Sequence, residues 1–321
     1  MGQLLSSLSP RKETREGSVA DVAAVLARAQ RVCVLTGAGI SKESGIPTFR
    51  DPSDGIWARY DPMVYATIWG FDRSPEKIWE LLRDFLAENV PRPNPGHASL
   101  AELAALVETT VVTQNVDNLH QDAGSVGVIE FHGSLMEAAC RKCRAPGGPV
   151  AALLARGGPL PPRCAACAGP LKPSAVLFGE RIPEDAAQLA YAAATACDVF
   201  LVVGTSANVQ PAANLPRMAL AAGATVIEVN TEATALTGRT SDILLRGKAG
   251  VVLPQVILAV KQLRANGGGG GGGGGGGRAA AADAAPRASL CTPQPQRWRR
   301  AGRRAQPRAP LSPAHSGLHL A

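Results

Sequence analysis

Short runs of apolar, often β-branched residues alternate with helical patterns along most of this chain. The strand candidates lie at 31–36, 109–113, 128–131, 198–203, 225–229 and 242–245. Apolar residues recur at helical spacing in the segments 18–29, 75–89, 97–107, 183–195, 212–222 and 251–264. This alternation predicts an α/β layered fold with a parallel sheet. The run Val199–Val203 lacks polar residues, as expected for a strand that helices cover on both faces.

The first helix has a recognisable start. Ser18 is a preferred N-cap residue, and Asp21 follows three residues later, ahead of the first apolar positions. We therefore expect this helix to begin immediately after Ser18.

Two stretches interrupt the alternation. Residues 45–95 are rich in turns and hold three of the four tryptophans, and residues 134–175 hold four cysteines among many Pro and Gly. We expect both stretches to form a second, smaller lobe. Hydrophobic residues make up 45% of the 321 residues, which is enough for a core, and Ala, Val and Leu must build most of it because aromatics make up only 4%.

The positive charge of the chain is concentrated at its end. The formal net charge is +7, but segment 278–321 holds eight Arg and one Asp, which leaves 25 basic and 25 acidic residues in 1–277. A run of eleven glycines, 267–277, precedes this segment. Polyglycine buries no apolar surface and loses much backbone entropy on ordering, so we expect 265–321 to be a disordered tail. Any contact with nucleic acid would involve this tail alone.

Residues 1–17 are polar, and we expect them to be flexible. They lack the apolar region of a secretory signal, and Met1–Ser6 matches the short N-myristoylation pattern at Gly2, which chance often produces. No apolar run reaches the roughly 18 residues of a spanning helix, so we expect no requirement for a membrane. We expect a monomer. The sequence does not determine the compartment: we favour the cytoplasm, with the nucleus and the mitochondrion as alternatives.

Four of the seven cysteines form two pairs, Cys140-x-x-Cys143 and Cys164-x-x-Cys167, with twenty residues between them. Each pair directs two thiolates to one centre, and two pairs complete the tetrahedral sulfur site that Zn²⁺ prefers. Such a site has no open position, so its zinc would be structural. Neither pair lies at a strand–helix junction, which argues against a thioredoxin-like redox motif. Two other cysteines lie in or beside predicted strands and are expected to be buried apolar residues: Cys33 and Cys197.

A glycine-rich turn, Gly37-Ala38-Gly39-Ile40-Ser41, follows the strand 31–36 and opens a helix. Glycines there allow close backbone approach to a pyrophosphate, and a helix N-terminus favours an anion. The motif is not a complete G-x-G-x-x-G, because Lys42 stands where the last glycine would fall, so a simple tight turn is the alternative.

Polar residues also follow several other predicted strands. They are Gln114, Asn115, Asp117, Asn118 and His120, then His132 and Gly133, and finally Gly204, Thr205, Ser206 and Asn230. Open α/β sheets bind ligands at the carboxyl ends of their strands. Any one of these residues could belong to a cap or a turn, but with the glycine turn they predict a nucleotide site that contains an ionisable histidine.

These motifs together resemble those of the sirtuins, the NAD-dependent protein-lysine deacylases. The matching segments stand in family order: 37–51, 113–120, 131–133, the two cysteine pairs, 172–180, 204–206 and 229–230. The resemblance covers a domain spanning 18–264. It implies a large Rossmann-like lobe, a smaller lobe with helices and a zinc module at 134–175, and NAD between the two lobes.

The resemblance also implies roles for individual residues. The residues that would bind NAD are Gly37, Ala38, Gly39, Ser41, Thr48, Phe49, Arg50, Trp57, Gln114, Asn115, Asp117, Gly204, Thr205, Ser206, Asn230 and Ala249. Asn115 and Asp117 would also act in catalysis by fixing the amide and a water, and His132 would be the catalytic base. The residues that would pair with the extended backbone of an acylated-lysine substrate are Val176, Leu177, Phe178 and Gly179.

The reaction that the resemblance implies suits these residue types. The carbonyl oxygen of an acyl-lysine is a poor nucleophile, so it needs a cation-like ribose carbon, which the departure of nicotinamide provides. A histidine that titrates near neutrality can then take the proton of a ribose hydroxyl. The products would be nicotinamide, deacylated lysine and O-acyl-ADP-ribose. The alternative is that His132 merely ends a strand.

One departure from the family pattern concerns the acyl group. Residues 50–62 and 78–80 are similar to those of sirtuins that prefer acidic acyl chains, which carry Tyr and Arg three and six residues after this tryptophan. Here those positions hold Leu82 and Phe85, and Arg83 lies roughly 100° away around a helix. Burying a succinyl carboxylate without a cation is costly. We therefore expect Leu82 and Phe85 to line a pocket for acetyl or fatty acyl groups; the alternative is that both only pack the core.

Two other functions would use parts of the same sequence. A protein mono-ADP-ribosyltransferase would share the NAD site, but the complete set of Asn115, Asp117 and His132 favours deacylation. A non-enzymatic zinc and nucleic-acid module would use the basic tail as its anchor. The balanced charge of 1–277 counts against that function.

Overall fold

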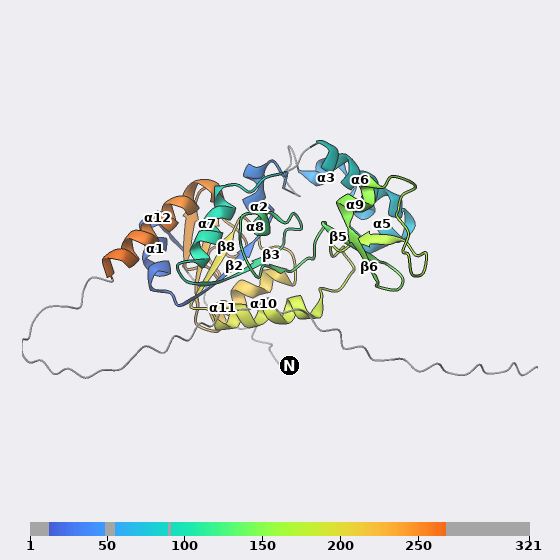
Figure 1. Cartoon of the computed structure of the whole chain (residues 1–321). Helices are drawn as coiled ribbons and strands as arrows, with labels where there is room; N and C mark the ends of the chain where they lie inside the picture. Colours follow the sequence, from blue (N-terminus) through green and yellow to red (C-terminus); the bar gives the residue numbers. More distant parts are fainter. Residues whose placement is uncertain (1–12, 49–54, 89–90, 268–321) are drawn as a thin grey trace, which may run out of the picture. The chain divides into compact units, whose positions relative to one another are not determined.

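The computed structural model describes residues 13–48, 55–88 and 91–267 (Figure 1). The predictions of N-myristoylation at Gly2 and of a disordered basic segment beyond 267 lie outside the described residues.

A seven-stranded sheet forms the large lobe, in the order β1-β10-β9-β8-β2-β3-β4. Its strands are Arg15–Glu16 (β1), Arg31–Thr36 (β2), Glu108–Thr113 (β3), Ile129–Glu130 (β4), Val199–Val203 (β8), Thr225–Asn230 (β9) and Ile243–Arg246 (β10). Every neighbouring pair is parallel. Each of the six predicted strands is present, and the predicted parallel α/β architecture is confirmed.

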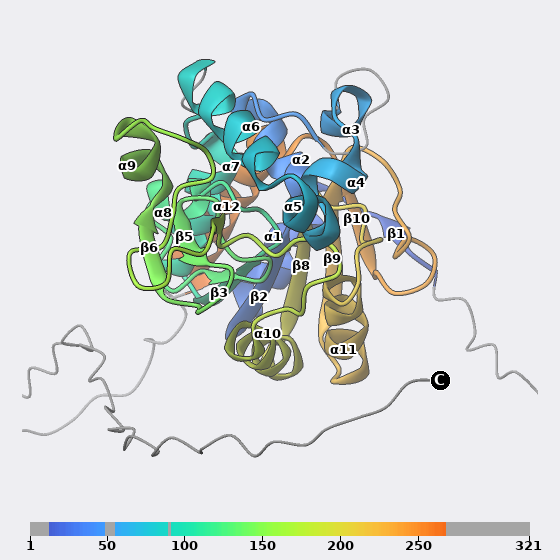
Figure 2. The same cartoon turned by 90° about the vertical axis from the view of Figure 1, so that its right-hand side faces the viewer.

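Helices cover both faces of this sheet (Figures 1 and 2). One face packs against α1 (Val19–Arg28), α7 (Pro95–Ala104) and α12 (Ala249–Gly267), and the other against α10 (Glu184–Ala196) and α11 (Leu215–Ala221).

The central strand β8 explains why its sequence has no polar positions. Val199, Leu201 and Val203 lie in the core on one face of the sheet, whereas Phe200 and Val202 lie in the core on the other. Successive side chains of a strand point to opposite faces, so a strand between two helical layers buries all of them.

The ends of the domain differ from the prediction. Helix α1 begins after Ser18, as expected, and the Ser18 amide donates to Asp21 Oδ2 at 2.8 Å in a capping box. Within the stretch predicted to be flexible, Arg15–Glu16 forms strand β1, parallel to β10. Helix α12 continues through Gly267, past the predicted end at 264, because Arg264 holds it by donating to backbone carbonyls of Leu106 and Ala29. Strand β1 and the last turn of α12 both depend on contacts with residues distant in the sequence, so local sequence patterns could not predict them.

The smaller lobe is built from the two stretches that interrupt the alternation. The first forms the helices Ile56–Arg59 (α3), Pro62–Tyr65 (α4), Ile68–Arg73 (α5) and Pro75–Glu88 (α6). The second forms an antiparallel sheet in the order β6-β5-β7 and one helix: Glu137–Cys140 (β5), Pro146–Pro149 (β6), Val150–Ala155 (α9) and Leu171–Pro173 (β7). Trp79 is fully buried in the core that both stretches share, and its Nε1 donates to the Leu171 carbonyl at 2.9 Å.

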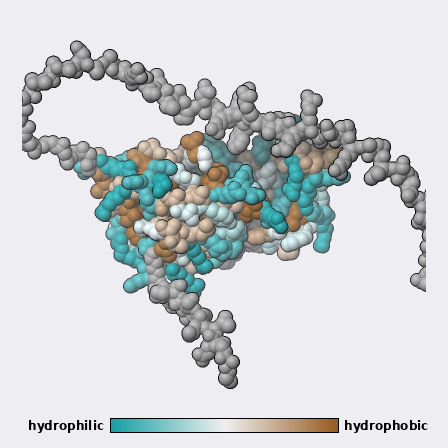
Figure 3. Space-filling view, turned by 90° about the horizontal axis from the view of Figure 1, so that it is seen from below, coloured by the Kyte–Doolittle hydropathy of each residue, from teal (hydrophilic) through white to brown (hydrophobic). Residues whose placement is uncertain are grey.

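Four short helical segments complete the described elements: Ala38–Ser41 (α2), Lys42–Ser44 (η1), Leu119–Asp122 (α8) and Ala212–Asn214 (η2). On the face shown in Figure 3, hydrophobic residues are interspersed among hydrophilic ones. None of the helices in the described part of the chain combines the length and apolarity that crossing a membrane requires.

Candidate active site

The strand order of the large sheet reverses between β2 and β8. From β2 the sheet continues through β3 to β4, whereas from β8 it continues through β9 and β10 in the other direction. The chain therefore continues from the two central strands in opposite directions along the sheet, and such a switch point is where open α/β sheets bind ligands. The glycine turn follows β2 and Gly204 follows β8, so both predicted segments lie at this switch point.

The two loops at the switch point pack backbone against backbone. The Gly39 amide donates to the Gly204 carbonyl at 2.8 Å, and the Gly37 amide donates to the Val203 carbonyl at 3.2 Å. A Cβ at Gly39 would lie 2.7 Å from the Gly204 oxygen, and Gly204 itself has a φ of +58°. Glycine is thus required by close approach at Gly39 and by backbone conformation at Gly204.

Two predicted cofactor residues at different strand ends contact a third, Thr205. The Gln114 side chain donates from Nε2 to Thr205 Oγ1 at 3.0 Å, and Asn230 Nδ2 donates to the Thr205 carbonyl at 3.1 Å. Gln114 directly follows β3, Thr205 lies shortly after β8, and Asn230 is the last residue of β9. The structure therefore brings the predicted strand-end residues together at one edge of the sheet, with Ser206 exposed beside them.

Ser41 is the centre of a second polar group. Its hydroxyl donates to Asp117 Oδ2 at 2.7 Å and accepts from Asn115 Nδ2 at 3.0 Å. Asn115 also donates to the Gly37 carbonyl at 3.1 Å. Ser41 is fully buried and Asn115 nearly so, so these bonds fix the orientation of both residues next to the glycine turn.

His132 lies two residues after the end of β4 and contacts Gln114, the residue before Asn115. Its Nδ1 lies 3.1 Å from the Gln114 carbonyl oxygen, which accepts but cannot donate. The neutral ring therefore carries its proton on Nδ1, and Nε2 is left as the basic nitrogen. Burial is the main cause that lowers the pKa of His132, and the bond to Gln114 opposes it. His132 is thus mainly neutral at pH 7, as a general base requires.

The sequence did not single out His97, which lies near Ser41. The backbone amide of Asn94 donates to His97 Nδ1 at 3.3 Å. The ring proton of His97 is therefore on Nε2, which lies 3.4 Å from Ser41 Oγ. His120 lies edge-on to His97, with ring centroids 4.9 Å apart, and its Nε2 lies 2.9 Å from Thr36 Oγ1. The one sequence signal for His97 is the N-cap pattern Asn94-Pro95, which predicts a helix start rather than a site.

Both histidines are buried and neutral. Burial lowers the pKa of His97 to about 4, although Asp117 opposes the shift, and burial together with His97 lowers the pKa of His120 to about 3. His97 and His120 therefore carry no positive charge near neutral pH.

Ala249 lies at the start of α12, close to the segment that follows the glycine turn. The next amide, that of Gly250, donates to Glu43 Oε2 at 2.8 Å, which attaches η1 to this helix. Thr48 is described, and its carbonyl accepts from Ile56 at 3.0 Å. Two further predicted cofactor residues, Phe49 and Arg50, lie outside the described residues. For Trp57 only the backbone position, in α3, is described.

The predicted substrate segment Val176–Gly179 is bound on two sides. Its first amide donates to the His132 carbonyl at 2.8 Å. Phe178 donates to the Ala66 carbonyl at 2.8 Å and accepts from the Ile68 amide at 3.0 Å. The segment is therefore joined both to the residue predicted as base and to the start of α5.

The predicted acyl-pocket residues lie on α6. Leu82 is 5% exposed and belongs to the core of the smaller lobe, while Phe85 is half-buried. Arg83 is exposed, and its Nε donates to Asp84 at 3.0 Å. Its charge therefore lies on the outer surface of α6 and not beside Leu82.

The four predicted zinc ligands form one cluster. Their sulfur atoms all lie within 4.8 Å of one another: Cys140, Cys143, Cys164 and Cys167. The backbone amides of Cys143 and Lys142 each donate to Cys140 Sγ at 3.4 Å. These bonds, of which the one from Cys143 has the largest effect, lower the pKa of the Cys140 thiol to about 6. Four sulfur donors without an open position fit a structural zinc ion.

Cys33 and Cys197 are buried in the large lobe, as predicted. Burial raises the pKa of Cys33 and raises that of Cys197 to about 11, so both remain neutral thiols.

Comparison with known proteins identifies the class. Residues 37–211 match the model of the Sir2 family. NAD-dependent protein deacylase 2 of Pyrobaculum aerophilum is 46% identical over 245 residues, which are 75% of this chain and 96% of that protein. The crystal structure of a Sir2 homologue in complex with NAD matches with a TM-score of 0.70 and 38% identity, over 78% of this chain and 97% of the other. The structure of Sir2Af2 bound to a myristoylated histone peptide matches with a TM-score of 0.64 and 37% identity, over 77% and 98%.

The chain belongs to the Sir2 family. It is an enzyme of the NAD-dependent protein deacylase type, with a Rossmann-like lobe, a smaller lobe and a four-cysteine cluster that can hold zinc.

Proposed function

We propose that this chain transfers acetyl or fatty acyl groups from protein lysine side chains to the ADP-ribose part of NAD, and that it disfavours succinyl groups. The observation that carries the proposal is the geometry of His132. Its Nδ1 is held 3.1 Å from the backbone carbonyl of Gln114, the residue before the buried Asn115, which leaves Nε2 as the basic nitrogen.

The residues of the crevice fit NAD. A Cβ at Gly39 would collide with Gly204, so the two loops form a cradle of bare backbone that can lie against a pyrophosphate. The polar ends of Gln114, Thr205 and Asn230 can bind the ribose and adenosine parts. NAD supplies nicotinamide as the leaving group and a ribose hydroxyl as the final acyl acceptor.

Asn115, Ser41 and Asp117 position polar groups on the nicotinamide side. Their mutual bonds at 2.7 and 3.0 Å are made within the protein and hold these groups in place, so little reorganisation is needed when charge develops at the ribose. His132 Nε2 then takes the proton of the ribose hydroxyl. Because the pKa of His132 is lowered by burial, the base stays unprotonated through the neutral range.

Zinc acts at a distance from this chemistry. The four sulfur donors leave no open position, so the ion would hold β5 and the loop before β7 together rather than touch the substrate. The smaller lobe then presents the segment Val176–Gly179 to the acylated peptide as a strand-like edge.

The acyl preference rests on the residues of α6. Leu82 is buried in an apolar core, Phe85 is half-buried, and the cation on this helix, Arg83, is exposed. An acyl chain that reaches this region would meet hydrocarbon, which favours acetyl and fatty chains and penalises a carboxylate. The complex of Sir2Af2 with a myristoylated peptide indicates that a related enzyme accepts such a chain.

The activity is tested by mixing the full chain with NAD and an acetyl-lysine peptide. We expect nicotinamide release that needs both the peptide and His132, and His132→Asn should lower turnover by about 10²- to 10⁴-fold while NAD still binds. ADP-ribose that becomes attached to the peptide, with the acetyl group retained, would instead support ADP-ribosyl transfer.

The acyl preference is tested with acetyl-, succinyl- and myristoyl-lysine peptides of one sequence. We expect the lowest kcat/KM on the succinyl peptide. The double variant L82Y/F85R should raise succinyl turnover selectively, because it supplies the cation and hydroxyl that the wild-type positions lack. Fastest turnover of the succinyl peptide by the wild-type chain would refute the preference.

A further inference from the structure

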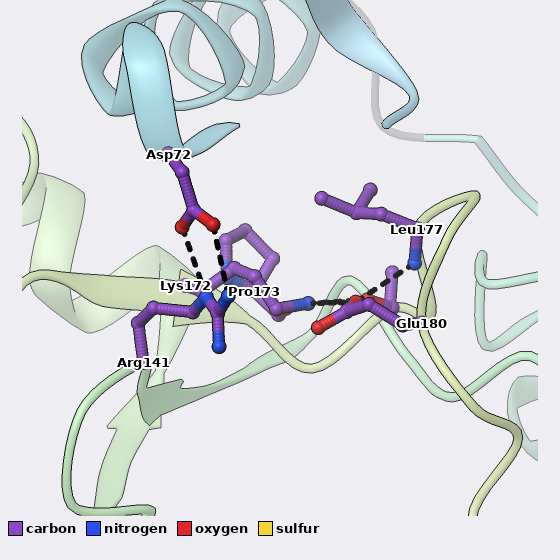
Figure 4. A network of polar contacts seen from close by, with 7 residues as sticks. Asp72, Arg141, Lys172, Pro173, Leu177 and Glu180 are labelled. Atoms are coloured by element: carbon purple, nitrogen blue, oxygen red, sulfur yellow. Dashed lines mark hydrogen bonds and ion pairs between the residues drawn. The ribbon is translucent and has the colours of Figure 1, made fainter. Parts of the chain in front are cut away.

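Lys172 is a buried cation whose three ammonium protons all have acceptors. Its side chain is 9% exposed, and Nζ donates to the carbonyls of Pro173 at 2.9 Å and Ala175 at 2.6 Å (Figure 4). The third partner is the Glu180 carboxylate, also at 2.9 Å, whose side chain is 15% exposed. The chain from 173 to 180 therefore curves around one ammonium group, which can donate no further bond.

Glu180 adds a second constraint to the same turn. Its Oε2 accepts from the Leu177 amide at 2.9 Å as well as from Lys172 (Figure 4). The Glu180 amide in turn donates to the Leu177 carbonyl at 2.9 Å. A buried carboxylate that bonds both an ammonium and an amide fixes the backbone between them more strongly than a turn in water could.

These contacts determine which groups of the substrate segment remain for a ligand. Three successive amides already donate within the protein: Val176 to the His132 carbonyl at 2.8 Å, Leu177 to Glu180 at 2.9 Å and Phe178 to the Ala66 carbonyl at 2.8 Å. Two carbonyls of the segment are used as well, because Leu177 accepts from the Glu180 amide and Phe178 from the Ile68 amide. A substrate strand would therefore meet the Val176 carbonyl and the exposed Gly179. Where these groups point depends on the turn around Lys172.

We propose that Lys172 and Glu180 are positioning residues for the acylated peptide: they hold 173–180 in the shape that binds the peptide, and they set the affinity for peptide but not for NAD. This proposal rests on the deacylase function proposed above. None of the bonds of Lys172 or Glu180 reaches Gly37, Gly39 or Thr205, which carry the cofactor side of the crevice.

Three variants of the full-length chain test the pair. Lys172→Met keeps the length of the side chain and removes all three donated bonds. Glu180→Ala removes the acceptor of the Leu177 amide, whereas Glu180→Gln retains an oxygen that can accept it. The matched control is Lys77→Met, which breaks an exposed ion pair with Glu80 in the same lobe, 3.0 Å long and with side chains 44% and 39% exposed.

Binding of a fluorescent acetyl-lysine peptide is measured by anisotropy, NAD binding by calorimetry, and turnover by nicotinamide release. Each variant is first checked for one bound zinc. We expect Lys172→Met and Glu180→Ala to weaken peptide binding and raise the peptide KM by about tenfold or more, with NAD affinity within about twofold of wild type. Glu180→Gln should lie between these variants and wild type, and Lys77→Met should equal wild type.

The outcomes separate this proposal from the deacylase function. A wild-type chain that neither binds nor turns over an acyl-lysine peptide would refute both. If the wild-type chain binds and turns over the peptide, and Lys172→Met and Glu180→Ala have the same peptide KM as wild type, the positioning role alone is refuted. A parallel loss of NAD and peptide affinity in both variants, with zinc retained, would also refute it, because the pair would then support the fold and not the peptide segment.

Discussion

The glycine loops that we propose to bind NAD and the segment 176–179 that we propose to bind the peptide are held in different ways. The cofactor loops extend β2 and β8, central strands whose two faces are buried in separate apolar cores. The peptide segment follows β7, a strand of three residues in a three-stranded sheet. Its shape depends on a buried ion pair, and its lobe carries four clustered thiols. A large apolar core can fix loops by itself, whereas a small lobe needs added cross-links.

Removing zinc should have the largest effect, and it should affect one lobe. Cys164→Ser removes one of four ligands, and structural zinc contributes on the order of 10 kcal/mol to the folding of small domains. We expect loss of bound zinc and loss of peptide binding, while the far-ultraviolet circular dichroism of the large lobe persists.

Cys197→Ser is the matched control, because Cys197 is a buried thiol of the large lobe that lies outside the zinc cluster. It should retain one zinc per chain. If Cys164→Ser bound peptide normally without zinc, the cross-link explanation of the smaller lobe would be wrong.

Acid should weaken the large lobe through its neutral histidines. The pKa of His97 is lowered to about 4 and that of His120 to about 3, so below pH 6.5 the unfolded chain binds protons that the folded chain does not. Stability from these residues is complete above about pH 6.5 and falls as the pH drops toward 4, by on the order of 3 kcal/mol for each histidine.

Urea unfolding at pH 7 and at pH 4.5 measures this loss. The variant H97Q/H120Q should show a smaller difference between the two pH values than wild type, since glutamine does not titrate. An identical pH dependence in variant and wild type would assign the loss to carboxylates elsewhere.

Replacing Gly39 by alanine should weaken the binding of NAD but not the binding of peptide. The added Cβ would lie 2.7 Å from the Gly204 oxygen, and relieving such a contact costs about 1–3 kcal/mol. We expect Gly39→Ala to weaken NAD binding by about tenfold, as calorimetry would measure, and to leave peptide affinity unchanged. Gly223→Ala is the control, because its φ of +96° makes it strained while no atom lies within 4 Å of the new Cβ. Equal NAD affinities in the two variants would show that the cradle does not bind the cofactor.

The smallest effect is expected at the exposed ion pair between α5 and the zinc module. Arg141 donates to both oxygens of Asp72 at 3.0 and 2.9 Å, with side chains 31% and 47% exposed (Figure 4). Asp72→Asn should lower the free energy of unfolding by about 1 kcal/mol or less, because water screens such a pair. A loss well above that, of about 2 kcal/mol or more, would mean that exposed contacts also hold the smaller lobe.

Much of the fold could be predicted because it depends on local patterns. Apolar runs placed the strands of the large sheet, Ser18 and Asp21 placed the start of α1, and the spacing of four cysteines placed the metal cluster. Strand β1 was missed because its two residues gain their structure only by pairing with β10, more than two hundred residues away.

The sequence named the members of the candidate site, and the structure gives the bonds among them. Asn115, Asp117 and His132 were expected on the residues and the family resemblance. The structure joins Asn115 and Asp117 through Ser41 and joins His132 to the carbonyl of Gln114. His97 was missed, because its sequence context indicates a helix cap and its contact with Ser41 spans 56 positions. Lys172 and Glu180 stood in a recognised motif without a role, because a charged side chain is normally exposed and only the fold buries this pair.

By itself the sequence determined the alternation of strands and helices, the glycines at close backbone contacts, and the metal-binding cysteines. Each of these follows from periodicity or from the steric and ligand properties of single residue types. The tertiary structure alone decided which nitrogen of His132 is basic, that Lys172 is surrounded by carbonyls, and that three amides of the peptide segment are already used. The physical reason is desolvation. An exposed polar group can always form hydrogen bonds with water, whereas a buried polar group needs a hydrogen-bond partner that only the fold can place beside it.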